Sequence, residues 1–400
     1  MPALRSGHVG IMPPGALGVA MFYHLTRQAT RLDHPVHLLQ RPGSRSGARL
    51  RETGSLRLLH NGALTALPLR THLRGDLLDG LRNDHLPEVV LVATNPDQLN
   101  GVITNLVELS EALFAREPGA APEALAEQLP ILVFCANGIY FQRLRQIYLE
   151  KLEESTLLGR LPDLWPEAMP RIISRILRGV TLQTGLREGT GATALYRPGP
   201  PGQTIVAGSH EPTRARACAV LQHRGGWFDD AGSESPTRVE FQKALINLSF
   251  NLIGMIHCID AGSGHFGPQR VGDVLDDSNQ LAEARALAES VVEIGKAVRA
   301  YGPEESFETI FAQLKGSAEA HRGHVPSSIQ LLEQRLRTGE LRAEVTPTEG
   351  WLINPLIHYA RNSELPEVAR HLEDLKGQLI QRLQRAIDHY GLAAEVEPQE

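Results

Sequence analysis

Residues 8–26 read HVGIMPPGALGVAMFYHLT, in which a short apolar run ends at a Pro/Gly turn and a stretch of helical character follows. This order predicts a strand, a tight turn and a helix. In nucleotide-binding sheets the glycines of such a turn let the backbone approach a pyrophosphate at the helix N-terminus, and Gly15 and Gly18 occupy two of the three glycine places. Pro13 stands where the first glycine would be. Its locked φ and missing N–H depart from that pattern.

Further strands are predicted on the C-terminal side of this turn, at residues 35–40, 88–93 and 130–134, with helical stretches between them. Strands that alternate with helices predict a parallel sheet covered on both faces. Arg41 follows the second strand, where NAD-binding sheets usually carry an acidic residue. A basic residue there suits a 2′-phosphate, so the sequence favours NADP. The alternative is an arginine in a solvated loop.

A second informative segment, residues 241–256, is almost wholly apolar but carries Lys243, Asn247 and Asn251 at intervals of four. On an α-helix each step of four residues advances about 400°, so the three side chains form one stripe. A helix that is apolar on most of its circumference is buried, and a buried amine and two carboxamides need partners. The stripe therefore predicts a functional site, with a polar network inside a helical core as the alternative.

Length, charge and cysteine content narrow the class of protein. A chain of 400 residues is expected to divide into two or three domains. The 40 Lys and Arg against 46 Asp and Glu give a net charge of −6, which argues against nucleic acid or a membrane surface and favours a small-molecule partner. Cys135, Cys218 and Cys258 lack metal-ligand spacing, and we expect no metal site. The sequence shows no secretory signal and no apolar run long enough to span a membrane, so we expect a cytoplasmic protein.

These residues resemble the ketopantoate reductase family, part of the phosphogluconate-dehydrogenase-like group of NADP-dependent reductases. The motifs occur in the order of that family along most of the chain: the Pro-Gly-Ala-Leu-Gly turn ending at Gly18, Arg41, Asn137-Gly138, the Lys243 helix, Ser327-Ser328, and then Glu344 and Gly350. The resemblance implies two domains. Residues 1–232 would form an α/β Rossmann-type NADP-binding domain with helical insertions, and residues 233–400 an all-α domain of the phosphogluconate-dehydrogenase-like C-terminal type.

By this resemblance, the protein would reduce a 2-keto acid such as ketopantoate to the 2-hydroxy acid with NADPH. Lys243 and Glu344 would have the catalytic roles: Lys243 would protonate the carbonyl oxygen, and Glu344 would grip a substrate hydroxyl and orient the reacting end. A ketone that becomes an alkoxide develops negative charge on oxygen, which an ammonium group both stabilises and protonates. The matching substrate-binding positions are Asn247, Asn251 and Ser328. The matching cofactor-binding positions are Gly15, Ala16, Leu17, Gly18, Arg41, Asn95 and Asn137.

Several departures leave alternatives open. Asn95 stands where the family commonly has a lysine, and Ala261 is roughly where another substrate asparagine is expected, which favours the same chemistry on a different carbonyl substrate. Pro13 favours a non-catalytic NADP-binding scaffold or sensor. The alternative to a binding role for Ser328 is that it caps a helix N-terminus. The alternative for Glu344 is that it lies at a solvated helix end. A homodimer stays open.

The chain is longer than typical family members, with insertions expected at 110–128 and 140–177. The first is Ala/Glu/Pro-rich and predicts a surface excursion. The second has an apolar helical face, which predicts a segment that covers the cofactor cleft or packs against another subunit.

Overall fold

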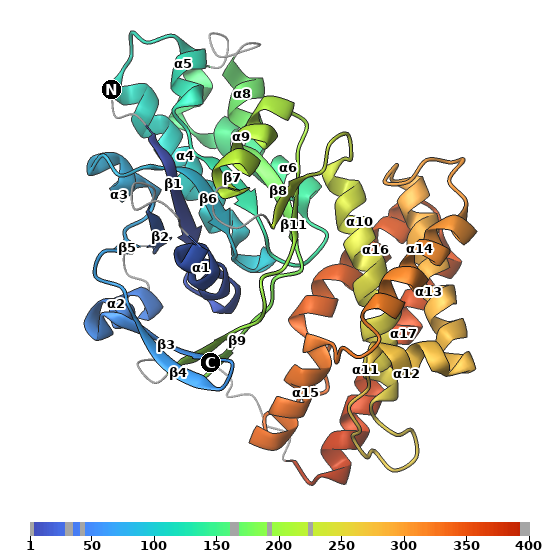
Figure 1. Ribbon diagram of the computed structural model, residues 1–400. Coiled ribbons are helices and arrows are strands. Elements are labelled where there is room, and N and C mark those ends of the chain that lie inside the picture. The colour runs from blue at the N-terminus through green and yellow to red at the C-terminus, as the bar shows by residue number, and fades with distance from the viewer. Residues whose placement is uncertain are drawn as a thin grey trace. The chain divides into compact units, whose positions relative to one another are not determined.

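The computed structural model describes residues 4–28, 35–40, 45–160, 168–189, 194–222 and 227–392, which fold into two compact units (Figure 1). The first unit comprises residues 1–137 and 141–239, and the second comprises 138–140 and 240–400. The break falls after Val239, inside helix α10 (Pro236–Ile246), and not after residue 232. The second unit therefore takes a tripeptide from the middle of the first.

Eight strands form the large sheet of the first unit, in the order β12-β11-β8-β7-β6-β1-β2-β5. Their bounds are β1 Arg5–Met12, β2 Val36–Leu39, β5 Leu73–Arg74, β6 Pro87–Val92, β7 Ile131–Phe134, β8 Ile176–Thr181, β11 Thr204–Ala207 and β12 Phe228–Asp230. The strands from β8 to β5 pair in parallel, whereas β11 pairs with β8 in the antiparallel direction. β6 and β7 are buried at every position, as near-continuous apolar strands are when helices cover both faces.

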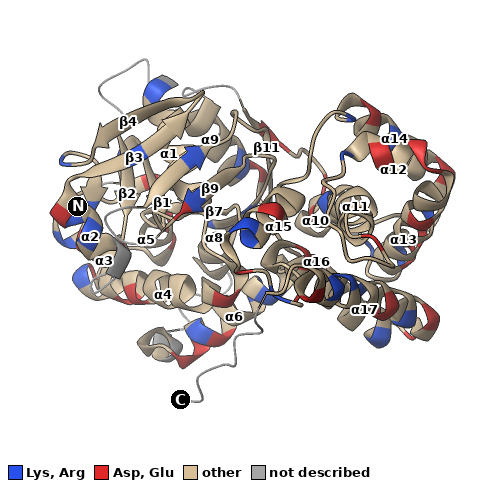
Figure 2. Ribbon diagram, turned by 90° about the horizontal axis from the view of Figure 1, so that it is seen from below, with Lys and Arg blue, Asp and Glu red and all other residues tan. Residues whose placement is uncertain are grey.

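Helices cover both faces of this sheet. Figure 2 shows α1 and α9 on one side and α4 and α6 on the other. The helices of the first unit are α1 Ala16–Gln28, α2 Arg45–Thr53, α3 Leu77–Arg82, α4 Leu99–Arg116, α5 Pro122–Glu127, α6 Phe141–Glu154, α8 Ala168–Ser174 and α9 Glu211–Gln222, with 3-10 turns η1 Pro96–Gln98 and η2 Thr156–Arg160. Val9 and Ile11 of β1 pack with Phe22 of α1 and Leu221 of α9 in one apolar core. The predicted doubly covered parallel sheet is confirmed.

A second, four-stranded sheet lies against α1 and was not predicted from the sequence. Its order is β4-β3-β10-β9, with bounds β3 Ser55–His60, β4 Ala63–Pro68, β9 Gly185–Glu188 and β10 Leu195–Pro198. Gly185 approaches α1 so closely that a Cβ there would lie 2.5 Å from the Ala16 carbonyl oxygen. The Tyr196 hydroxyl donates to the Pro14 carbonyl over 3.3 Å. The small sheet thus supports the first turn of α1 from outside the large sheet.

The second unit consists mainly of helices. They are the end of α10, the π-helical turn η4 Asn247–Leu252, α11 Ile253–His257, α12 Val271–Asp276, α13 Ser278–Ala297, α14 Phe307–Ala320, α15 Ser327–Thr338, α16 Pro347–Asn362 and α17 Pro366–His389. Their apolar faces meet in a separate core that contains Leu248, Ile253, Leu287 and Leu379, all fully buried. The predicted all-α C-terminal domain is confirmed in kind.

The two expected insertions belong to the first unit. Ser110 and Phe114 are buried within α4, so the first part of 110–128 is core helix and the prediction of a surface excursion is wrong there. In the second expected insertion, helix α6 packs against α4 of the same unit, with Leu144 and Tyr148 on its buried apolar face. This helix completes the covering of the sheet, and neither of the two roles considered for it is needed to explain its apolar face.

Candidate functional site

Four neighbouring strands of the large sheet, β7-β6-β1-β2, run parallel, so their carboxyl ends lie along one edge. The predicted cofactor residues follow these ends: Asn137 after β7, Asn95 after β6, Gly15 to Gly18 after β1, and Arg41 after β2. Arg41 lies outside the described residues. The chain runs from β1 to β2 on one side and reaches β6 on the other, which makes this edge a topological switch point, where open α/β sheets bind ligands.

The turn between β1 and α1 is tight, and its two glycines differ. The Met12–Pro13 peptide is cis, and the Gly15 N–H donates to the Pro13 carbonyl over 2.8 Å. A Cβ on Gly18 would lie 2.2 Å from that same carbonyl oxygen, so the fold itself requires a glycine there. A Cβ on Gly15 would meet no atom of the described residues within 4 Å. Gly15 therefore leaves open space at the N-terminus of α1, where the N–H groups of Ala16 and Leu17 belong to the first helical turn and have no intrahelical acceptor.

A basic depression of about 320 Å³ lies at the end of β2. Its lining includes Gln40, Arg51, Arg70, Arg74 and Asp79. The side-chain amide of Gln40 is satisfied when its nitrogen donates to the Gly47 carbonyl (3.0 Å) and its oxygen accepts from Arg51 Nη1 (2.7 Å). Arg74 Nε is buried and has no hydrogen-bond partner in the described part of the chain. Three guanidinium groups against one carboxylate favour an anion in this depression.

Asn95 and Asn137 flank β6 and β7 differently. Asn95 is exposed at the start of η1, and its backbone carbonyl accepts from the Gln98 N–H over 3.0 Å. Asn137 is half-buried. The segment before it is held to β6, because the Cys135 N–H donates to the Val92 carbonyl over 2.7 Å. The structure therefore holds the backbone just before Asn137 firmly and leaves the Asn95 side chain in solvent.

In the second unit, the segment with Lys243, Asn247 and Asn251 is helical, but a π-helical turn interrupts it from Asn247 to Leu252. Because i→i+5 hydrogen bonds widen the turn, the step from Asn247 to Asn251 falls slightly short of a full turn, whereas the α-helical step from Lys243 to Asn247 slightly exceeds one. The two deviations oppose each other, so the three side chains remain on one stripe. Asn247 is buried, and Lys243 and Asn251 are half-buried, so the stripe lies at the border of the core.

The two asparagine side chains make no hydrogen bond with any residue that the structure describes. Asn247 is only 6% exposed. Its amide is therefore held in a mostly buried position and is free to form hydrogen bonds with a ligand. The two asparagines also form no hydrogen bond with each other, as they would in the alternative of a polar network inside a helical core.

A buried carboxyl group forms the second polar feature of this unit. Glu349, in the first turn of α16, is fully buried and accepts hydrogen bonds from the hydroxyls of Ser328 and Thr346. Burial raises its pKa from 4.5 to about 7, and the bond from Ser328 opposes that rise. Helix α16 packs against η4, so the Glu349 helix is a direct neighbour of the helix with the asparagines. Ser328 is bound to this carboxyl instead of capping α15, whose N-cap position is Pro326.

Glu344 does not join this group. Its side chain is 54% exposed and lies 3.6 Å from the Arg335 guanidinium in an ion pair. Sequence reasoning missed Glu349, although Thr346-Pro-Thr-Glu349 has the spacing of a capping box at a helix start. That signal predicts a helix N-terminus and contains no information on burial, which comes from the packing of α15 on α11 and of α16 on η4.

The tripeptide 138–140 is fastened within the second unit beside these features. The Ile139 N–H donates to the Trp351 carbonyl (3.0 Å), two residues after Glu349, and the Tyr140 N–H donates to the Glu240 carboxylate (3.2 Å), three residues before Lys243. Gly138 has φ 129°, and a Cβ there would lie 3.1 Å from Trp351. A glycine is therefore required directly after Asn137.

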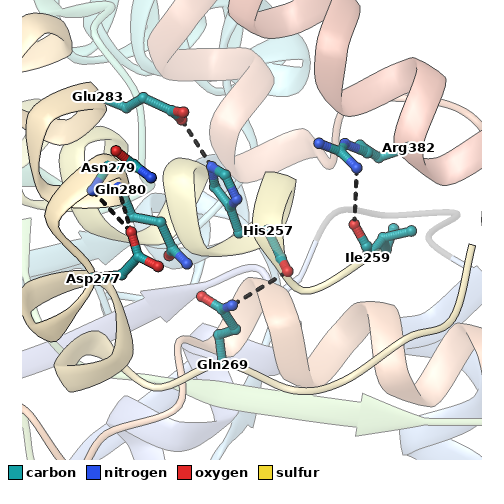
Figure 3. A network of polar contacts seen from close by, with 8 residues as sticks. All are labelled: His257, Ile259, Gln269, Asp277, Asn279, Gln280, Glu283 and Arg382. Carbon is teal, nitrogen blue, oxygen red and sulfur yellow. Dashed lines mark hydrogen bonds and ion pairs between the residues drawn. The ribbon is translucent and has the colours of Figure 1, made fainter. Parts of the chain in front are cut away.

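The far end of the Lys243 segment is held by a polar network (Figure 3). His257, the last residue of α11, pairs with Glu283 of α13 over 2.8 Å, and its carbonyl accepts from Gln269 over 3.2 Å. The Arg382 guanidinium of α17 reaches the Ile259 carbonyl at 3.5 Å. These hydrogen bonds with Glu283, Gln269 and Arg382 hold the end of the helix and the residues just after it. They thereby limit the rotation of the Lys243 stripe about the helix axis.

Other chemistry finds little support in the described ranges. No group of three or more His, Cys, Asp or Glu side chains there is arranged to hold a metal ion. The three cysteines are buried free thiols, and burial raises the pKa of each to about 12, which keeps them protonated. Every helix in the described ranges is too short or too polar to span a bilayer.

Comparison with solved structures identifies the fold. D-mandelate dehydrogenase, solved with NADH and anilino(oxo)acetate, matches 95% of this chain and 99% of its own with a TM-score of 0.62 at 13% identity. The probable 2-dehydropantoate 2-reductase of Bacillus subtilis matches 94% and 99% with a TM-score of 0.57 at 16% identity. This chain has the ketopantoate reductase fold.

A ketopantoate reductase from Ralstonia eutropha JMP134 agrees, with a TM-score of 0.55 at 16% identity over 94% of this chain and 99% of that one. No protein-family model matches the sequence, and no curated protein matches it. The ketopantoate reductase resemblance predicted from the sequence is confirmed at the level of the fold.

Proposed function

We propose that the protein is an NADPH-dependent oxidoreductase that reduces a 2-keto acid to the 2-hydroxy acid. The observation that carries the proposal is the pair of asparagine amides, Asn247 and Asn251, which have no hydrogen-bond partner among the described residues and share a helical stripe with Lys243. Such a stripe suits a small polar molecule with a carbonyl and a carboxylate. The ketopantoate reductase fold and the switch-point edge of the sheet support a dinucleotide as the second ligand.

In this proposal each polar side chain of the second unit has a distinct task. The Lys243 ammonium donates a proton to the carbonyl oxygen, where negative charge develops during reduction. Asn247 and Asn251 hold the substrate by hydrogen bonds and so orient the carbonyl. When bound, NADPH supplies the hydride.

Glu349 takes the place that the resemblance assigned to Glu344. Its pKa of about 7 leaves the carboxyl partly protonated at neutral pH. Ser328 and Thr346 hold its two oxygens in place, and because Glu349 is fully buried it acts on the substrate through the Ser328 hydroxyl.

The preference for NADPH rests on basic groups near the end of β2. Arg51, Arg70 and Arg74 line the depression there, and guanidinium groups are donors suited to phosphate oxygens. Arg41 follows the same strand in sequence. Together these groups favour a 2′-phosphate over a free ribose hydroxyl.

The test is the oxidation of NADPH, followed by its absorbance, with ketopantoate, branched 2-keto acids and an aromatic 2-keto acid. The aromatic compound is included because D-mandelate dehydrogenase shares the fold. We expect turnover with at least one of these, and Lys243→Ala should lower it by roughly two to four powers of ten with little change in NADPH affinity. Full activity of Lys243→Ala with a good substrate would refute the proposed role of the lysine.

A non-catalytic NADP-binding protein is the second candidate, favoured by Pro13 in place of the first fingerprint glycine. Calorimetric titration separates the two. NADPH binding without turnover across the whole panel would favour the scaffold, whereas absence of binding would reject both candidates.

A further inference from the structure

Arg178 of β8 is the largest fully buried side chain in the described part of the protein, with 2% of its surface exposed. Its Nη1 donates to the carbonyls of Phe134 (2.6 Å) and Gly179 (2.7 Å), and its Nη2 donates to the carbonyl of Ala136 (2.9 Å). A buried guanidinium is strongly unfavourable unless hydrogen bonds satisfy it. An arginine is rare inside a buried strand, and the three hydrogen bonds of Arg178 show which part of the chain it holds in place.

That segment is the end of β7 and the two residues after it. Phe134 is the last residue of β7, and the Ala136 carbonyl belongs to the peptide that joins Ala136 to Asn137. A trans peptide is planar, with its carbonyl and N–H pointing in opposite directions. Fixing the Ala136 carbonyl on Arg178 therefore fixes the direction of the Asn137 N–H and the origin of the Asn137 side chain.

We propose that Arg178 is a positioning residue for Asn137, and that it sets the affinity for the nicotinamide end of the dinucleotide. The inference rests on the proposed function and on the resemblance to ketopantoate reductases, by which Asn137 matches the asparagine beside the nicotinamide. Charge-assisted bonds from one rigid guanidinium fork to Phe134 and Ala136 hold this loop in one conformation before the cofactor arrives. Preorganisation of this kind lowers the free energy needed to order the loop on binding.

A second buried arginine provides a matched control. Arg214 of α9 is 6% exposed, donates through Nη1 to the Gly208 carbonyl (2.5 Å) and pairs through Nε with Asp230 (2.8 Å). It resembles Arg178 in burial and bonding, but it ties α9 to the residue after β11 and to the last residue of β12, and neither strand leads to a predicted cofactor residue. Loss of Arg214 should therefore lower stability without touching the Asn137 loop.

The experiment compares the whole dinucleotide with the fragment that lacks the nicotinamide. NADPH and 2′-phospho-ADP-ribose are titrated by calorimetry into the wild type, Arg178→Met and Arg214→Met. We expect the wild type to bind NADPH more tightly than the fragment, and Arg178→Met to lose about tenfold or more of that difference while its fragment affinity is unchanged. Arg214→Met should keep the difference. The inference is overturned if Arg178→Met keeps the wild-type difference between its affinities for NADPH and for the fragment. It is also overturned if Arg178→Met and Arg214→Met lose affinity for the fragment to the same extent.

A double-mutant cycle then tests the route through Asn137. Asn137→Ala should itself remove the difference, and adding Arg178→Met should remove no more, because the two residues act on one contact. Independent, additive losses would refute the positioning role. Should Arg178→Met fail to fold, Arg178→Lys keeps the charge but cannot reach both carbonyls as a fork, and the same titrations decide with it. A wild type that binds dinucleotide and fragment equally would instead refute the proposed role of the nicotinamide, and a wild type that binds neither would refute the proposed function.

Discussion

At the residue scale, Glu349 shows how position in the fold changes the chemistry of an ordinary side chain. Glu344 and Glu349 are five residues apart in sequence, yet one is an exposed ion-pair partner of Arg335 and the other is fully buried. Burial disfavours the charged form and raises the pKa of Glu349 to about 7. The buried carboxyl is held in place by two hydroxyls and can change its charge near neutral pH.

The stability of the protein should depend on pH through Glu349. Its carboxyl is harder to ionise in the folded than in the unfolded state, so its contribution is fully present below its usual pKa of 4.5 and is lost as pH rises through about 7. Between pH 5 and pH 8 the free energy of unfolding of Glu349→Gln, measured in urea, should rise relative to that of the wild type by up to about 3 kcal/mol. Glu344→Gln is the matched control, and an unchanged pH dependence in Glu349→Gln would contradict the raised pKa.

The same pair tests the assignment of the site. Glu349→Gln should lower kcat/KM for the best 2-keto acid by about tenfold to a thousandfold, because the Ser328 hydroxyl is then held by an amide that cannot change its charge. Glu344→Gln should stay within about twofold, since a solvated ion pair contributes little. Steady-state kinetics with saturating NADPH measures both. If Glu344→Gln instead lowered kcat/KM more than Glu349→Gln, Glu344 would be the carboxyl group of the site.

At the element scale, the β1–α1 turn was predictable and the π-helical turn was not. An apolar run followed by Pro, Gly and helical residues is a local pattern, and the structure has strand, turn and helix where the sequence placed them. The spacing of Lys243, Asn247 and Asn251 indicates a stripe but not the widened turn from Asn247 to Leu252, which depends on packing against α13 and α16. The small sheet escaped prediction because its strands β3 and β10 are 135 or more residues apart in the chain.

The two glycines of the β1–α1 turn should respond differently to alanine. Gly15→Ala should fold with near-normal stability, because the added Cβ meets no atom in the described part of the chain, and should lose dinucleotide affinity if the pyrophosphate lies there. Gly18→Ala should be clearly destabilised, because its Cβ would lie 2.2 Å from a backbone oxygen. Thermal unfolding and calorimetric titration of both variants provide the measurement. Normal NADPH binding by Gly15→Ala would remove the turn from the cofactor site.

At the scale of the whole molecule, each unit has its own apolar core, and the predicted cofactor residues all belong to the first. The parallel sheet followed from sequence patterns of residues close together in the chain, and the division into an α/β part and a helical part followed from the family resemblance. The transfer of residues 138–140 to the helical unit did not, because it depends on contacts with Glu240 and Trp351, about 100 or more residues away.

Ligand linkage should reveal which residues belong to the cofactor site. NADPH at about 100 times its Kd should stabilise the protein by about 2.7 kcal/mol. Lys243→Ala should keep this stabilisation, because its amine is assigned to the substrate, and Gly15→Ala should lose it. Unfolding transitions with and without NADPH measure the effect. Loss of the stabilisation in Lys243→Ala would place the lysine in cofactor binding.

The shared tripeptide has a consequence for protein engineering. A fragment cut at the break after Val239 would lack Ile139, a member of the helical core, and would leave Glu240 and Trp351 without the N–H donors of Tyr140 and Ile139. No single cut of the chain yields both units whole. Gene fragments that divide the chain there should give an unstable helical half, and a chimera that grafts this half onto another Rossmann-type domain must carry Gly138 to Tyr140 with it.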